Sequence, residues 1–147
     1  MQLVDEIAHG ARAESDVWSQ ALRDEPDWEP VFSPLAPPEL ALGLETVYEA
    51  YLVHYGRPRL FDAADADDAV LLGDYLYAHG LVRIAKAGGV PAVSVLAQLI
   101  AHCAALRADG TGGDGAAWVD AARALGGEPD DAEVERALAS HSGRVAT

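Results

Sequence analysis

The sequence feature that most constrains the fold is a segment, residues 69–86, that would be apolar on nearly every side of a helix. Its apolar side chains are Val70, Leu71, Leu72, Tyr75, Leu76, Tyr77, Leu81, Val82, Ile84 and Ala85. A helix of this kind is usually covered on most sides, so we expect the segment to be the central helix. Because Asp74, Arg83 and Lys86 interrupt the apolar run, we expect no membrane-spanning segment.

The rest of the chain also has helical periodicity, with proline and glycine between the periodic segments. The predicted helices cover residues 2–24 (with Gly10 a weak point), 39–55, 69–86, 91–108 and 116–125, and a last helix opens at Asp130 with Glu133 in a capping box. The expected connections include a proline-rich linker (25–38, pinned by Trp28 and Phe32), a glycine-rich loop (109–115) and a frayed tail (142–147). We therefore predict an all-α fold, a single helical domain over residues 1–147 with five to six helices.

Charge and cysteine content exclude several classes of function. The 147 residues include 24 acidic and 10 basic side chains, which gives a formal net charge of −14 at pH 7. Nucleic acids and anionic membranes attract positive surfaces, so we expect neither as a partner. The single cysteine, Cys103, excludes an internal disulfide and a cysteine-based zinc site, and we expect it to be a small buried hydrophobic residue. Residues 1–10 lack the basic region of a secretory signal, which predicts a cytoplasmic protein.

One segment of the predicted central helix carries a family resemblance. Residues 69–78 read AVLLGDYLYA, which resembles the A-V-L-x-G-D-Y-L-x-A segment of the trans-isoprenyl (polyprenyl) diphosphate synthases. In that family an arginine-arginine-glycine-x-proline element lies shortly upstream, and here residues 54–58, HYGRP, stand in its place. The resemblance covers roughly residues 39–108. It implies the N-terminal and central half of the isoprenoid synthase fold, with Gly73 and Asp74 as structural residues.

The family's first aspartate-rich motif, DDxxD, corresponds to residues 45–49, ETVYE, in this chain. In the family that motif holds Mg²⁺ on the substrate diphosphate, which needs several converging carboxylate oxygens. Glu45 and Glu49 share one helix face and are the candidate metal ligands, but a solvated helix face is the favoured interpretation of the pair. We expect no cofactor, with Mg²⁺ as the alternative.

The arginine pair of the family is replaced by His54 and Tyr55, which leaves Arg57 and Arg59 as the candidate substrate-binding residues that the resemblance implies. The chain is shorter than a full synthase, and the family's second aspartate-rich helix is missing. We therefore assign no catalytic residue and predict no prenyl elongation by this chain alone.

Other polar residues have structural interpretations that compete with functional ones. Asp74 stands in an apolar helix, where a carboxylate is costly unless it is paired, so we expect a buried and hydrogen-bonded side chain. For the acids before residue 69, helix capping is favoured over a cation site: Asp62, Asp65, Asp67 and Asp68. For the tyrosines at helical spacing, packing is favoured over a ligand site: Tyr48, Tyr51 and Tyr55. We expect His79 and His102 in the core.

Three functions follow from these observations. The first is a non-catalytic small subunit or partner of a polyprenyl diphosphate synthase in isoprenoid biosynthesis. The second is a helical interaction module without a role in that pathway, and the third is a small Mg²⁺-dependent prenyl diphosphate-binding enzyme, a prenyltransferase. In the family the helix with the GD segment belongs to the subunit interface. This implies a homodimer, or a heteromer with a full-length prenyl diphosphate synthase, in which Leu72, Leu76 and Ile84 face the other chain and Gly73, Ala78 and Gly80 allow close helix approach.

Overall fold

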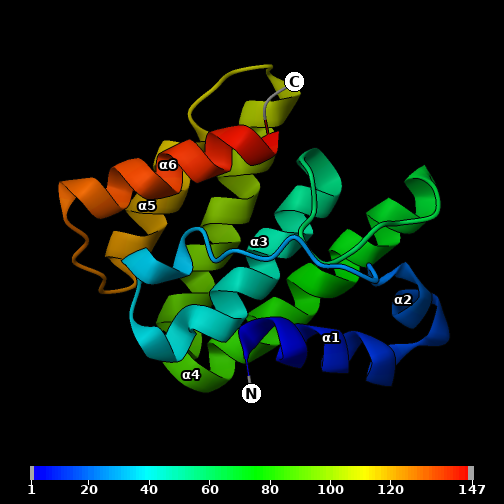
Figure 1. The fold of residues 1–147 in the computed structure, drawn as a ribbon. Helices are drawn as coiled ribbons and strands as arrows, with labels where there is room; N and C mark the ends of the chain where they lie inside the picture. Colours follow the sequence, from blue (N-terminus) through cyan, green and yellow to red (C-terminus); the bar gives the residue numbers. More distant parts are fainter. Residues whose placement is uncertain (1, 146–147) are drawn as a thin grey trace.

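The structure, a computed structural model, describes residues 2–145 and is an all-helical single domain (Figure 1). Its elements are α1 (Leu3–Glu14), α2 (Asp16–Ala21), the 3₁₀ turns η1 (Ser33–Leu35) and η2 (Pro38–Leu40), α3 (Ala41–Tyr55), α4 (Ala66–Ala108), α5 (Asp114–Ala124) and α6 (Asp131–Val145). The described residues contain no strand, and their β-pairing is limited to an isolated antiparallel bridge between Leu22 and Phe61. The predicted fold class, an all-α domain of five to six helices, is confirmed.

The first predicted helix, residues 2–24, is in fact two helices that meet at Ser15. The backbone of Ser15 is extended (φ −164°, ψ 154°), and its side-chain oxygen accepts a hydrogen bond of 3.1 Å from the backbone N–H of Trp18. Serine favours this N-cap position because its oxygen satisfies one of the free N–H groups at a helix start. Gly10, the expected weak point, lies inside α1 instead, where the helix passes the guanidinium of Arg83.

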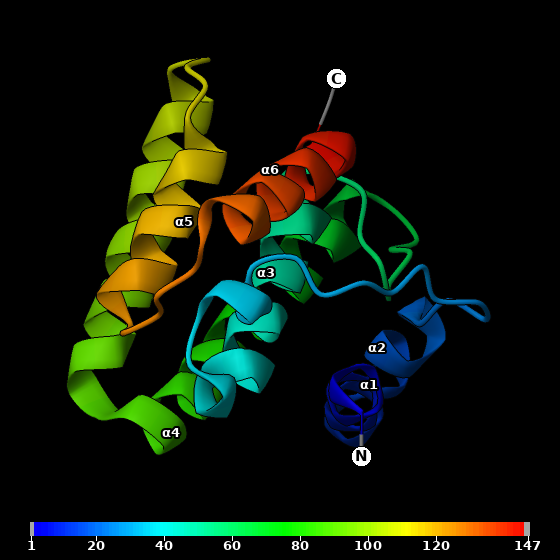
Figure 2. The same cartoon turned by 60° about the vertical axis from the view of Figure 1, so that its left-hand side comes forward.

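The long helix α4 bends at Gly89, which has a φ of +71°. Glycine reaches this left-handed conformation without a steric penalty, and Pro91 then starts the second segment with its fixed φ. We call residues 66–88 the first arm and residues 90–108 the second arm. Figure 2 shows α5 lying along the second arm, beyond the bend. The predicted break at Gly88–Gly89 between two helices is confirmed.

The central helix is α3, which corrects the expectation for residues 69–86. Every residue from Gly43 to Leu52 is buried, because α3 contacts α1, α4, α6, η1 and η2. The first arm of α4 buries one face and leaves Val70, Leu71 and Val82 about half exposed. The first arm is apolar on nearly every side, but residues 2–145 cover only one of its faces.

Glycines allow α3 and the first arm to pack closely. A Cβ on Gly43 would lie 2.7 Å from Cγ1 of Ile84, one on Gly80 would lie 2.6 Å from Cγ2 of Val47, and Gly73 faces the ring of His54. These glycines therefore serve a contact within the chain. Leu72, Leu76 and Ile84 are likewise in the chain's own core, at 0%, 1% and 0% exposure. The expectation that these three side chains face another chain is wrong.

The connections are shorter and better packed than expected. Phe32 is fully buried and Trp28 is half-buried, so the proline-rich segment is pinned to the body as predicted. The glycine-rich loop ends earlier, because α5 begins at Asp114. The expected frayed tail is wrong over residues 142–145, since α6 continues to Val145 and buried Arg144 donates a hydrogen bond of 3.0 Å to the carbonyl of Asp27. Residues 146 and 147 of that predicted tail lie outside the described residues.

Candidate functional site

The two candidate metal ligands on α3 are held in a buried ion-pair network by Arg59. Arg59 Nη1 lies 2.5 Å from Oε1 of Glu45, and Arg59 Nε lies 3.0 Å from Oε1 of Glu49. All three side chains have 0% exposure. Burial alone would lower the pKa of the guanidinium, but the two carboxylates outweigh it and raise the pKa of Arg59 above its usual value. The guanidinium stays charged and neutralises both acids.

Backbone N–H groups occupy the remaining oxygens of these carboxylates. Oε2 of Glu45 accepts hydrogen bonds from the N–H groups of Val31 (3.1 Å) and Ser33 (3.0 Å). Oε2 of Glu49 accepts from the N–H groups of Arg59 (3.0 Å) and Leu60 (2.8 Å). The network therefore fastens two loop segments to α3 and satisfies backbone donors that would otherwise be buried without partners.

This arrangement changes the interpretation of the predicted metal and substrate residues. Glu45 and Glu49 do not form the solvated face we considered, and the hydrogen bonds of Arg59 and the backbone already occupy their oxygens. Arg59 has no surface on which a substrate could bind, and Trp28 covers it at 4.3 Å from the ring centroid. Arg57 is exposed, and it donates to the backbone carbonyl of Gly143. Within residues 2–145, no three His, Cys, Asp or Glu side chains converge as a metal site would need.

A second network, which sequence reasoning missed, joins α3, α4, α5 and α6 at Asp114. Its carboxylate oxygen Oδ2 lies 2.6 Å from the hydroxyl of Tyr51, 2.8 Å from Arg107 Nη2 and 3.0 Å from His141 Nε2. The other ring nitrogen of His141 lies 2.7 Å from the hydroxyl of Tyr48. Burial would raise the pKa of Asp114, but its hydrogen bonds with His141, Tyr51 and Arg107 hold that pKa well below its usual range.

Asp114, His141 and Tyr48 are hydrogen-bonded in series, as the groups of a proton relay are, but the Tyr48 hydroxyl at the end of the series is inaccessible to a substrate. Tyr48 has 0% exposure, and burial raises the pKa of its hydroxyl far above the usual value. No substrate reaches such a group in this conformation, so the network acts as a clamp between helices. The sequence contains part of the signal, since the spacing of Tyr48 and Tyr51 predicts that both pack on one helix face. Their partners on α4, α5 and α6 are too far along the chain for spacing to indicate.

The other predicted residues are scattered. Asp74 is not buried: its side chain is 64% exposed and lies 3.7 Å from Nε2 of His54, which corrects the expectation of a buried carboxylate. Asp65 caps α4 as expected, since it accepts a hydrogen bond of 2.8 Å from the N–H of Asp68. Cys103 is fully buried, which raises its pKa to about 12 and confirms its role as a small hydrophobic residue. His102 is exposed, so its expected place in the core is wrong.

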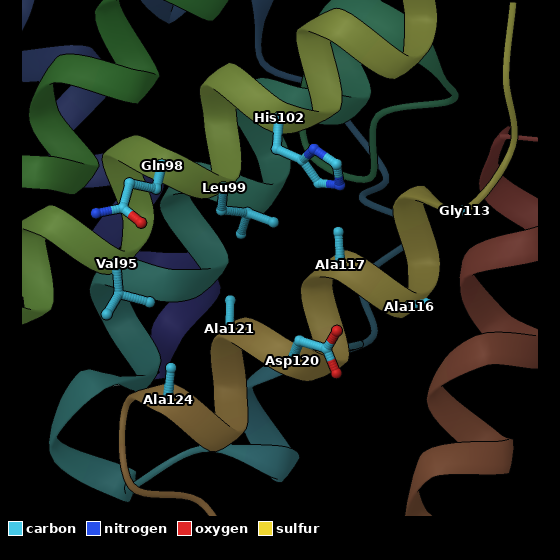
Figure 3. Close-up of a pocket in the computed structure, with 10 residues that line it drawn as sticks. All are labelled: Val95, Gln98, Leu99, His102, Gly113, Ala116, Ala117, Asp120, Ala121 and Ala124. Carbon is cyan, nitrogen blue, oxygen red and sulfur yellow. The ribbon is translucent and has the colours of Figure 1, made fainter.

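The surface hollows of the described residues include two along α4 that could receive a ligand or a side chain of a partner. The first, about 450 Å³, lies between the second arm of α4 and α5, and Figure 3 shows that small side chains such as Ala117 and Ala121 line it, with His102 and Asp120 on opposite walls. The second, about 380 Å³, lies between the end of α3 and the start of α4 and is mostly apolar. Neither hollow contains the buried networks.

The outer face of α4 is unusually apolar. The exposed large hydrophobic side chains of the described residues are Val17, Val70, Leu71, Val82 and Val90, and all but the first lie on α4. By length and composition alone α4 could cross a membrane, and only 22% of its most apolar window is buried. The expectation of no membrane-spanning segment stays a prediction, because α4 passes this test of length and composition, as core helices of soluble proteins also do.

Comparison with protein-family models, with curated proteins and with solved structures found no match to this chain. A function for this chain is therefore inferred from the geometry described above and from the segment resemblance at residues 69–78.

Proposed function

We propose that this chain is a non-catalytic helical partner subunit of a polyprenyl diphosphate synthase, acting in isoprenoid biosynthesis in the cytoplasm and without a metal of its own. The observation that carries the proposal is the buried pairing of Glu45 and Glu49 with Arg59. Prenyl transfer needs carboxylates open to Mg²⁺ and cations open to diphosphate. Here the corresponding side chains bind one another at 0% exposure, so they stabilise the fold instead.

The exposed apolar face of α4 supports association with another protein. Val70, Leu71 and Val82 are 55%, 57% and 49% exposed along the first arm. Several half-exposed large apolar side chains on one helix are a feature of interaction sites. Because each copy carries a net charge of −14, self-association is opposed by repulsion and a heteromer is favoured over a homodimer.

The deciding experiment is purification of the tagged chain from its native host, with identification of any full-length prenyl diphosphate synthase that accompanies it. The chain, the synthase and their mixture are then assayed with allylic and homoallylic diphosphates and Mg²⁺. We expect no elongation by the chain alone and a changed rate or product length in the mixture. Turnover by the purified chain at a typical enzyme rate of about 1 s⁻¹ would contradict the proposal.

A helical interaction module outside this pathway is the second candidate. The same exposed residues of α4 favour it, because exposed apolar side chains indicate a partner protein but do not indicate that the partner is an isoprenoid enzyme. The two candidates differ in the purification experiment. A stable partner that is not a prenyl diphosphate synthase, together with unchanged synthase activity in the mixture, would favour the second.

A further inference from the structure

The hollow at the start of α4 has the properties of an anchor pocket. It lies between the last turn of α3 and the first two turns of α4, and we call it the α3–α4 pocket. It is lined by Val53, His54, Tyr55, Ala66, Ala69 and Val70. Its lining is largely apolar and its volume, about 380 Å³, is large enough for a bulky apolar side chain. Val70 is 55% exposed, and its neighbour Leu71 extends the apolar surface beyond the pocket.

Two carboxylates flank the apolar pocket on α4. Asp67 and Asp74 stand three residues before and four residues after Val70, which places them on the same side of the helix, and Asp74 lies 3.7 Å from the pocket residue His54. Asp62, Asp65 and Asp68 add negative charge in the preceding loop and the first turn of α4. In the part of the chain that the structure describes, no lysine or arginine forms an ion pair with any of these five acids. Asp67 and Asp68 also favour the helix N-terminus, but Asp74 lies beyond that first turn and gains nothing from it.

We propose that the α3–α4 pocket binds a basic amphipathic helix of a partner protein, with one apolar side chain in the pocket and lysine or arginine side chains against the flanking carboxylates. Charge selects this occupant. A second copy of this chain would bring a further net charge of −14 to an acidic surface, and an anionic membrane or a nucleic acid would be repelled in the same way. A partner helix with apolar positions at spacings of three and four satisfies both the pocket and its rim. This inference deepens the proposed function and rests on it for the existence of a partner.

The test uses the full chain, labelled with ¹⁵N, and a synthetic amphipathic peptide of leucine and lysine as the probe. A second peptide has glutamate in place of lysine. We expect the lysine peptide to bind with amide shifts concentrated at residues 53–55 and 66–74, and the glutamate peptide not to bind. Val70→Arg should weaken binding by about tenfold or more, because it places a cation in the apolar pocket and adds repulsion at its edge.

Val82→Arg is the matched control, since Val82 is on the same arm and is 49% exposed but does not line the pocket. It adds the same charge, and we expect it to change the affinity by less than about threefold. Asp67→Asn combined with Asp74→Asn should weaken binding and reduce its dependence on salt. Equal effects of Val70→Arg and Val82→Arg, or shifts centred elsewhere on the chain, would overturn the inference. Tighter binding of uncharged or anionic vesicles than of the lysine peptide would overturn it too.

The same variants separate this inference from the proposed function. If a prenyl diphosphate synthase accompanies the wild-type chain and Val70→Arg releases it while Val82→Arg does not, both are supported. A synthase that stays bound to Val70→Arg would refute the pocket as its docking site and leave the proposed function intact. Pocket-specific peptide binding without any synthase would support the pocket and refute the proposed function.

Discussion

Removal of Arg59 is the sharpest test of the buried ion-pair network. Arg59→Met keeps a long apolar stem but leaves Glu45 and Glu49 as two carboxylates at 0% exposure without a cation. Removing one partner of a buried ion pair typically costs about 3–5 kcal/mol. That is a large fraction of the roughly 5–15 kcal/mol that stabilises an ordinary domain. For a chain of this size the melting temperature should fall by about 10 °C or more.

The assay is urea unfolding followed by far-ultraviolet circular dichroism and tryptophan fluorescence. A shift of the midpoint with an unchanged slope measures the lost free energy of unfolding. Arg12→Met is the matched control, because Arg12 is exposed on α1, and it should change the free energy by less than about 0.5 kcal/mol. If the free energy of unfolding of Arg59→Met is within about 0.5 kcal/mol of the wild type, this guanidinium does not neutralise both acids.

Replacing all three charges with leucine should not restore stability, which distinguishes this network from a simple buried ion pair. In many proteins such a replacement is neutral or stabilising. Here the two carboxylates also accept from four backbone N–H groups, those of Val31, Ser33, Arg59 and Leu60. Each buried donor left without an acceptor costs about 1–3 kcal/mol. A triple variant as stable as the wild type would show that those hydrogen bonds contribute little.

Three further predictions follow from the geometry. The pKa of Asp114 lies below its value in the unfolded chain, so the stability that this carboxylate contributes is complete above about pH 4 and is lost as the pH falls through the lowered pKa. Asp114→Asn should lower the free energy of unfolding by about 2 kcal/mol at pH 7. In urea titrations at several pH values, the variant should also lose less stability on acidification than the wild type. Gly80→Ala should lower the free energy of unfolding by about 1–3 kcal/mol, because the added methyl group would lie 2.6 Å from Cγ2 of Val47. Calorimetry should show this loss for Gly80→Ala and no loss for the exposed control Gly143→Ala. Asp74→Ala and Asp74→Leu should both have a free energy of unfolding within about 0.5 kcal/mol of the wild type, since the Asp74 side chain is 64% exposed. A loss near 3 kcal/mol for Asp74→Ala would contradict this and would mean that Asp74 has a buried partner.

Local features of the sequence predict the helices well. The break at Gly89, the cap at Asp65 and the capping box of Asp130 and Glu133 all form as their residue types indicate. These features depend on backbone conformation and on partners within about four residues, so a linear pattern contains the information. The break at Ser15 has the same local origin, since a serine before an acidic residue is a helix-start signal.

The candidate site depends on contacts that no local pattern specifies. The sequence indicates Glu45, Glu49 and Arg59 as candidate residues, but as ligands for a metal and a diphosphate. Their mutual pairing requires the chain to turn back after α3 and lay residue 59 against it. The pairing of Asp114 with His141 likewise requires α5 and α6 to meet beside α3. Ionisable groups at such a distance along the chain become partners only when tertiary packing brings them together, and the exclusion of water there strengthens their pairing.

The sequence by itself determined the all-α class and the main helix breaks, because propensity, capping and glycine or proline act over a few residues. The tertiary structure alone decided which helix is central. Residues 69–86 are the more uniformly apolar segment, yet α3 is the one enclosed, because the elements on either side of it in the chain fold back over it. Hydrophobic burial depends on total area covered, so two apolar helices can exchange these roles without any change in local pattern. That choice left the outer face of α4 uncovered by the described residues, and this face supports the proposed association with a partner protein.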